Sequence, residues 1–103
     1  MGLDLAGLRV EHFDRRIGER FYVDISKTAA AALELIEVGA LSPGSSPPSA
    51  FRPPFRLLFR GPQGPVFEQR ILPLRHAEMG KLEMFLVPIG PDAHGMRYEA
   101  IFT

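Results

Sequence analysis

The chain contains no cysteine among its 103 residues, which excludes a disulfide framework, a thiolate zinc site and a cysteine nucleophile. It also lacks net charge, because twelve basic residues balance twelve acidic ones. Dedicated nucleic-acid-binding proteins usually carry a strong positive excess, and membrane-surface binders carry a basic face. We therefore expect neither a nucleic acid nor a membrane as partner. Zero charge also removes repulsion between copies, which favours self-association.

Long hydrophobic runs are absent as well. No stretch approaches the roughly 20 apolar residues of a membrane-spanning helix. The start, MGLDLAGLRVEHF, lacks the basic and apolar segments of a secretory signal, so a cytoplasmic protein is expected. The length and a hydrophobic content of 46% are typical of one folded domain, which we expect to span residues 1–103.

Proline and glycine are abundant, with ten residues of each type. Proline is excluded from helix interiors and central strands, so the composition predicts many short elements joined by turns. The segment SPGSSPPSAFRPP, residues 42–54, is predicted to be a flexible Pro/Ser-rich loop. One short helix is predicted at residues 8–17, with Phe13 and Ile17 on one face and Gly18 as its stop.

The stretch FRPPFRLLFRGP, residues 51–62, places both arginine and phenylalanine at every fourth position. Its proline pair prevents a helix. On a strand, the phenylalanines face the core while Arg56 and Arg60 face outward. A nucleic-acid-binding surface needs aromatic and basic side chains on the same face, so this pattern does not predict one. We expect these arginines to pair with acidic residues on neighbouring strands, with Glu68 as a candidate.

Several other segments alternate between apolar and polar residues, as half-buried strands do. Pro73 predicts an edge position or a strand end for the segment that contains it. In KLEMFLVPIG both faces are apolar, which predicts that both are covered. The rows expected to share a face and point inward are Phe21, Val23 and Ile25; Phe55, Leu57 and Phe59; Phe67 and Ile71; Leu82, Met84 and Leu86; and Tyr98, Ala100 and Phe102.

Residues 28–39 fit two structures. Thr28 as a cap, the alanine run and Gly39 as a stop favour a helix. A strand is the alternative, and it requires a bulge near Ile36. With either assignment the chain is mostly β, with about six short antiparallel strands forming a small barrel or sandwich and one short N-terminal helix.

The blocks PFRLLFRGP, HAEMGKLEMFLVPIGP and RYEAIF resemble an uncharacterised family of bacterial domains of about this length, catalogued as a domain of unknown function. The similarity runs from EHF and IGERF to the C-terminus. It implies a mostly β domain and favours a strand over residues 28–39. It brings no activity and no catalytic residues. The resemblance also implies a role beside phage-tail-like proteins.

The three histidines are the main candidates for chemistry. His76 lies two residues before Glu78, and His94 lies two residues after Asp92. Two such pairs can hold a metal if they meet in space, but short pairs of this kind occur often by chance. The sequence has no glycine-rich phosphate loop, zinc-protease helix motif or nucleophile elbow. We therefore expect no catalytic residues, no metal, no cofactor and no enzyme activity.

The last two strands are predicted to form an antiparallel hairpin, since only a few residues around PDAHG join them. With one apolar row in the core, a second row lies outside, and the short N-terminal helix is expected to cover part of it. The remainder is expected to contact a protein partner or a second copy in a homodimer. Such a chain is a structural or interaction module, accessory to a phage-tail-like or surface assembly. The alternative is a small-molecule or peptide-binding barrel. The expected interaction surface consists of Phe85, Val87, Ile89 and Ile101.

Overall fold

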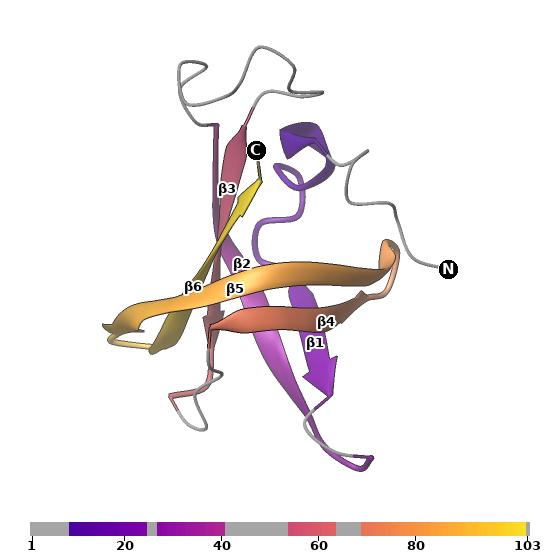
Figure 1. Cartoon of the computed structure of the whole chain (residues 1–103), viewed down its shortest axis with the longest axis vertical. Coiled ribbons are helices and arrows are strands. Elements are labelled where there is room, and N and C mark those ends of the chain that lie inside the picture. Colours follow the sequence, from indigo (N-terminus) through magenta and orange to yellow (C-terminus); the bar gives the residue numbers. More distant parts are fainter. Residues whose placement is uncertain (1–8, 25–26, 41–53, 64–68, 103) are drawn as a thin grey trace.

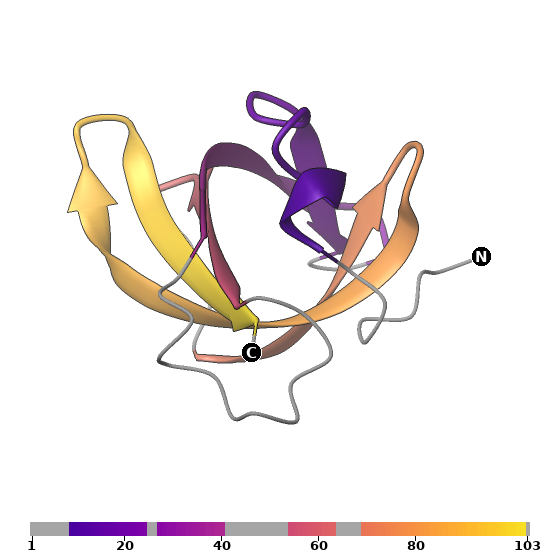
Figure 2. The same ribbon diagram turned by 90° about the horizontal axis from the view of Figure 1, so that it is seen from above.

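The computed structural model describes residues 9–24, 27–40, 54–63 and 69–102. These residues form six antiparallel strands that close into a barrel in the order β1-β2-β3-β6-β5-β4 (Figures 1 and 2). The mostly β fold predicted from the sequence is therefore confirmed, and it is a barrel. The strands are β1 (Arg20–Asp24), β2 (Ala30–Ala40), β3 (Phe55–Gly61), β4 (Arg70–His76), β5 (Gly80–Asp92) and β6 (Gly95–Phe102).

Apolar side chains fill the interior of the barrel. Most of the rows predicted from alternation point inward, because successive residues of a strand face opposite sides of a sheet. Aromatic rings gather inside: Phe55 stacks on Phe102 with 4.7 Å between ring centroids, and Phe21 meets Phe59 edge-on at 5.4 Å. Of the predicted loop 42–54, only Pro54 is among the described residues. Ile25 and Phe67 lie outside them.

Residues 30–40 form a strand rather than a helix. Ala31, Leu33 and Leu35 point into the core, and β2 pairs along both of its sides. The register with β3 shifts between Leu35 and Glu37, so the bulge predicted near Ile36 is confirmed. Pairing with two neighbours outweighs the helix propensity of the alanine run, as tertiary contacts often do.

The predicted N-terminal helix is wrong. Within residues 9–17 the chain forms only a 3-10 helix, η2 (Val10–His12), followed by turns, and the described residues contain no α-helix. Phe13 is fully buried while Ile17 is 53% exposed, so the two do not share a face. Phe13 contacts Phe55 and Phe102 inside the barrel, with ring centroids 5.9 and 6.3 Å away.

No α-helix forms here because the chain already pairs with β2 at Gly18 and Glu19, before β1 begins. The amide of Gly18 donates to the carbonyl of Leu35 at 2.7 Å, and the amide of Leu35 donates to the carbonyl of Glu19 at 3.0 Å. Gly18 turns the chain with a φ of +93°, a conformation that glycine adopts readily. Phe13 plugs the barrel, so the expectation that a helix covers part of the outer row of β5 is also wrong. No helix in the described residues is long and apolar enough to cross a membrane.

Strand β4 carries a second correction. Ile71 was expected inside but is 61% exposed, and the inward residues are Leu72, Leu74 and His76. Ile71 pairs with Phe85 of β5, and both lie on the outer face. Pro73 lies within β4 rather than at a strand end. Pairing between β4 and β1 is limited to one residue pair, so β4 resembles an edge strand on that side.

The arginines of β3 pair on the outside of the barrel. Arg56 donates to Glu99 at 3.0 Å and lies 3.9 Å from Glu37. Leu58 is on the same outer face but only 4% exposed, because it lies opposite Glu37 on one side and Glu99 on the other. The expected partner Glu68 lies outside the described residues. The arginines therefore face outward as predicted, and acids of β2 and β6 pair with Arg56.

The β5–β6 turn provides a test of the fold. A Cβ atom at Gly95 would lie 2.0 Å from the carbonyl oxygen of Gly61, a backbone atom that cannot move aside easily. We predict that Gly95→Ala lowers the free energy of unfolding by about 3 kcal/mol or more, measured by chemical denaturation. Gly39→Ala is the matched control, since its Cβ would make an ordinary contact with Arg56 at 3.6 Å. Equal stability of the two variants would contradict the close approach of the turn to β3.

Candidate functional site

The barrel closes where β1 meets β4, and this seam has little backbone pairing. The register contains one pair, Tyr22 with Arg75. On the outside, Arg75 donates to Asp24 at 2.7 Å, and its guanidinium carbon lies 5.9 Å from the centre of the Tyr22 ring. Contacts of this geometry are attractive cation–π interactions. Side chains therefore supply much of the closure that a backbone ladder provides elsewhere.

On the inside of the seam, His76 makes three hydrogen bonds. Its Nε2 atom lies 2.6 Å from Oε1 of Glu19, and its Nδ1 atom lies 3.0 Å and 3.1 Å from the amide nitrogens of Glu78 and Met79. An amide can only donate, so Nδ1 accepts both bonds and carries no proton. The ring proton is therefore on Nε2 and is donated to the Glu19 carboxylate. The ring also contacts Phe21, with centroids 4.6 Å apart.

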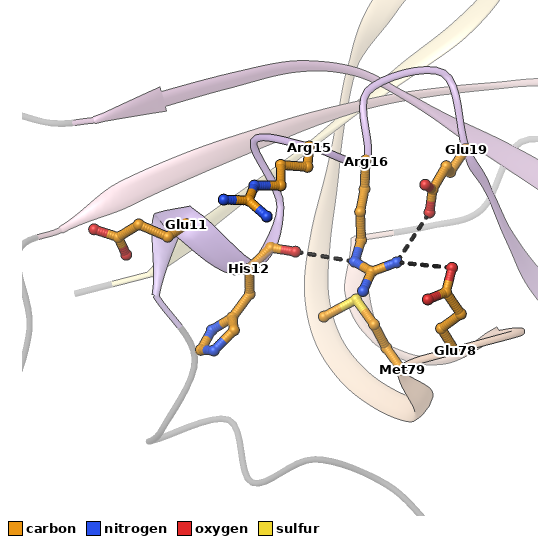
Figure 3. Close-up of a pocket in the computed structure, with 7 residues that line it drawn as sticks. All are labelled: Glu11, His12, Arg15, Arg16, Glu19, Glu78 and Met79. Carbon is orange, nitrogen blue, oxygen red and sulfur yellow. Dashed lines mark hydrogen bonds and ion pairs between the residues drawn. The ribbon is translucent and has the colours of Figure 1, made fainter.

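Arg16 lies beside this pair and binds three groups (Figure 3). Its Nε donates to the carbonyl of His12 at 3.0 Å, and its Nη1 lies 3.2 Å from Glu19 and 3.5 Å from Glu78. The hydrogen bond from His76 lowers the pKa of Glu19, with Arg16 adding to this effect and desolvation opposing it. Glu19 is thus held as a carboxylate between the seam histidine and an arginine.

These side chains border an open cleft of about 430 Å³. Figure 3 shows the turn segment after η2 on one side and the β4–β5 turn on the other. Both nitrogens of His76 are occupied, so this histidine has no free atom to act as a base or a metal ligand. The charged groups near Arg16 largely neutralise one another. The cleft is lined by Glu11, His12, Arg15, Arg16, Glu19, Glu78 and Met79.

The other predicted histidine pair lies elsewhere. Asp92 and His94 occupy the β5–β6 turn, at the opposite end of β5 from His76 (Figure 1). The two pairs therefore do not meet. In the part of the chain that the structure describes, no three His, Asp or Glu side chains come together as a metal site would require.

Asp92 has a structural role at its turn. Arg60 donates to its carboxylate from Nε at 2.9 Å and from Nη2 at 2.5 Å. The amides of His94 and Gly95 donate to the same carboxylate at 2.8 and 3.0 Å. The hydrogen bond from Arg60, followed by that from His94, lowers the pKa of Asp92 to about 2. This aspartate fixes the turn and attaches it to β3.

The outer face of β4, β5 and β6 carries most of the exposed large apolar residues, and we call this group the outer strip. Each strand contributes one residue that is about half exposed or more: Ile71 is 61% exposed, Phe85 49% and Ile101 48%. Ile71 pairs with Phe85. The β5–β6 register begins with the pair of Val87 and Glu99, and Ile101 pairs with Arg56 of β3 on its other side. The outer strip comprises the exposed residues Ile71, Phe85, Ile89 and Ile101 together with the half-buried Val87.

Four of these residues were predicted as a surface from the sequence, and Ile71 was missed. The segment ILPL contains apolar residues in both phases of the alternation, so Ile71 and Leu72 compete for the core. The sequence signal that favours Leu72 is its two-residue spacing to Leu74. The register with β5 then decides the matter by placing Ile71 opposite Phe85.

The family model of a domain of unknown function, DUF6916, matches residues 8–102. The chain belongs to this family. The match covers all six strands and the β4–β5 and β5–β6 turns. It confirms the resemblance to an uncharacterised family. No curated protein and no solved structure matches the chain significantly. Function must therefore be inferred from the geometry of this DUF6916 domain.

Acid should weaken the fold through Asp92. Its pKa is about 2 in the folded protein, below the ordinary value of 3.8, so the folded state binds fewer protons. The stabilisation is present above about pH 3.8 and is lost as pH falls through about 2. We predict that Asp92→Asn is less stable than the wild type at pH 7, and that this difference disappears near pH 2 in denaturation experiments. A pH-independent difference would contradict this role.

His76 should stabilise the seam. His76→Phe keeps a ring against Phe21 but leaves the buried amide of Met79 without its acceptor and Glu19 without its donor. We predict a loss of about 2–4 kcal/mol in the free energy of unfolding. His94→Phe is the matched control, because His94 is exposed, and its effect should stay within about 0.5 kcal/mol. Similar stabilities for the two variants would show that His76 does not hold the seam.

Proposed function

We propose that this DUF6916 domain is a non-enzymatic interaction module that binds protein through its outer strip. The observation that carries the proposal is the exposure of Ile71, Phe85 and Ile101, at 61%, 49% and 48%, on the outer face of three adjoining strands, with Ile71 paired to Phe85. Burying one such side chain contributes roughly 1.5–3 kcal/mol. A contiguous exposed apolar patch on a small domain is typical of a protein contact.

The polar clusters support a non-enzymatic role. His76 uses both ring nitrogens inside the fold, and Glu19 accepts from His76 and Arg16. Asp92 accepts from Arg60 and from turn amides. A catalytic acid or base needs an atom within reach of a substrate. The hydrogen bonds of these groups instead hold the seam and the β5–β6 turn together.

The setting that we propose is an assembly of several proteins in a bacterial cytoplasm. A small barrel with a filled interior and one apolar outer face suits a connector between larger subunits. An accessory role in a phage-tail-like or surface assembly fits this geometry and is the more specific form of the proposal. Nucleic acid and membrane are not proposed as partners, because the chain has no net positive charge.

A second candidate, small-molecule or peptide binding, is favoured by the cleft beside Arg16. Its volume of about 430 Å³ lies within the usual range for ligand pockets, about 300–1,000 Å³. Such pockets are mostly apolar, however, and this one has five charged side chains in its lining, of which Arg16 pairs with Glu19 and Glu78. A thermal-shift screen with charged small molecules and short peptides tests it. A ligand whose stabilisation is lost in Arg15→Gln would favour the cleft.

The outer strip is tested by recovering partners from the native host. We predict that Phe85→Glu combined with Ile101→Glu abolishes recovery of a partner that the wild type binds, as identified by mass spectrometry and confirmed with purified proteins. Both side chains are exposed, so the variant should stay folded. Ile17→Glu is the control, since Ile17 is 53% exposed and lies outside the strip. Undiminished binding by the strip variant would exclude this surface.

A further inference from the structure

The imidazole of His76 holds the β4–β5 turn only while one of its nitrogens carries no proton. Its Nδ1 atom accepts hydrogen bonds from the amides of Glu78 and Met79 at 3.0 and 3.1 Å, and a doubly protonated imidazole has no acceptor left. We propose that His76 is a pH-sensitive switch, in which uptake of a second proton releases the β4–β5 turn while the link to Glu19 stays in place. This inference goes beyond the proposed function, because it concerns the seam and not the outer strip.

Both forms of the ring have stabilising partners among the groups on the inner side of the seam. The Glu19 carboxylate lies 2.6 Å from Nε2 and favours the imidazolium. The two amides that donate to Nδ1 favour the neutral ring, and Arg16, which lies 3.2 Å from the same carboxylate, also opposes a second positive charge. The turn itself carries Glu78, whose carboxylate lies 3.5 Å from Arg16. Protonation therefore exchanges two amide contacts for a stronger contact with Glu19.

On the outer side of the seam, three ionisable side chains line an open cleft together with the ring: Tyr22, Arg75 and Lys81. Arg75 is paired with Asp24 at 2.7 Å. Lys81 repels an imidazolium, but it is exposed, so water and salt weaken this repulsion. The side chain of His76 is only 4% exposed. The groups that touch its two nitrogens therefore determine the effect of a second proton.

Glu19 keeps its link to the ring as the pH falls. The hydrogen bond from His76 lowers the pKa of this carboxyl below its ordinary value of 4.5, with Arg16 adding to the effect and desolvation opposing it. Above that pH a proton taken up by this pair is therefore bound at Nδ1 of the ring, and Nε2 keeps the hydrogen that it donates to the carboxylate. The protonated form still connects the segment before β1 to the end of β4.

The β4–β5 turn is the part that changes. The amide of Met79 is buried, and a buried amide without an acceptor is unfavourable, so the turn must move until water or another acceptor reaches it. Met79 also belongs to the core, where it is 5% exposed. Both Glu78 and Met79 line the cleft beside Arg16 (Figure 3). That cleft therefore has one wall whose position depends on the protonation of His76.

The first test follows the ring and the turn together by NMR, from about pH 8 to about pH 5. At the upper end, the ring nitrogens of His76 should show a hydrogen on Nε2 and none on Nδ1. As the ring takes up its second proton, the amide resonances of Glu78 and Met79 should shift with the same midpoint. The exchange protection of the Met79 amide should fall at least about tenfold. A ring that titrates without these changes, or that does not titrate in this range, would overturn the inference.

His76→Asn is the matched variant, because its side-chain oxygen replaces Nδ1 as an acceptor and takes up no proton. The amides of Glu78 and Met79 should then keep the same protection from about pH 8 to about pH 5. His12→Gln is the control, since it removes a histidine that lines the cleft but does not bind the turn amides, and it should respond to pH like the wild type. A wild-type response in His76→Asn, or its loss in His12→Gln, would show that another group releases the turn.

Two charge variants test the balance around the ring, and neither outcome depends on whether the outer strip binds a protein. Glu19→Gln keeps an acceptor for the hydrogen on Nε2 but removes the negative charge that favours the imidazolium, so release of the turn should move to lower pH. Arg16→Gln removes the opposing positive charge, so release should move to higher pH. We expect each shift to be at least about half a pH unit. Shifts in the reverse directions, or no shift in either variant, would contradict the switch.

Discussion

The structure depends on the closure of its barrel at the seam between β1 and β4. Backbone pairing there is limited to Tyr22 and Arg75, so side chains must hold the two strands together. His76 does this on the inside by donating to Glu19, which precedes β1, while its other nitrogen accepts the amides of the β4–β5 turn. One imidazole therefore links the start of β1 to the end of β4. A backbone ladder tolerates many side chains, but this link requires a histidine in one tautomer.

This closure determines where a function can lie. With the seam shut, Phe13 fills the barrel from the side of η2, and the described residues that point inward are buried and mostly apolar. The polar groups with the most specific geometry, at His76 and at Asp92, are consumed in holding the seam and the β5–β6 turn. The unsatisfied surface is the outer strip, where apolar side chains remain exposed on three neighbouring strands. The domain is thus packed inside and carries exposed apolar side chains outside, which is the basis of the proposed protein contact.

Sequence reasoning predicted the strands better than the features that join them. Alternation is local, so the inward row of β5 and the outward arginines of β3 could be placed from neighbours alone. Phe13 could not, because its burial depends on rings about 40 and 90 positions away. The same holds for the link between Glu19 and His76, which are 57 residues apart, and for the pair of Arg60 with Asp92, 32 residues apart. The predicted inward orientation of Ile71 was wrong for a related reason, since only the register with β5 shows which apolar residue of ILPL faces outward.

The central claim, that His76 closes the barrel, is tested most directly by native-state amide hydrogen exchange, read residue by residue for the wild type and His76→Phe. If the seam depends on this side chain, the amides of β1, of β4 and of Met79 will exchange faster through local opening. The amides of β3 and β6, which are paired along their full lengths, will keep a higher protection, because strands far from the seam open only with global unfolding. Equal acceleration at every strand, or unchanged exchange at Met79, would contradict the account.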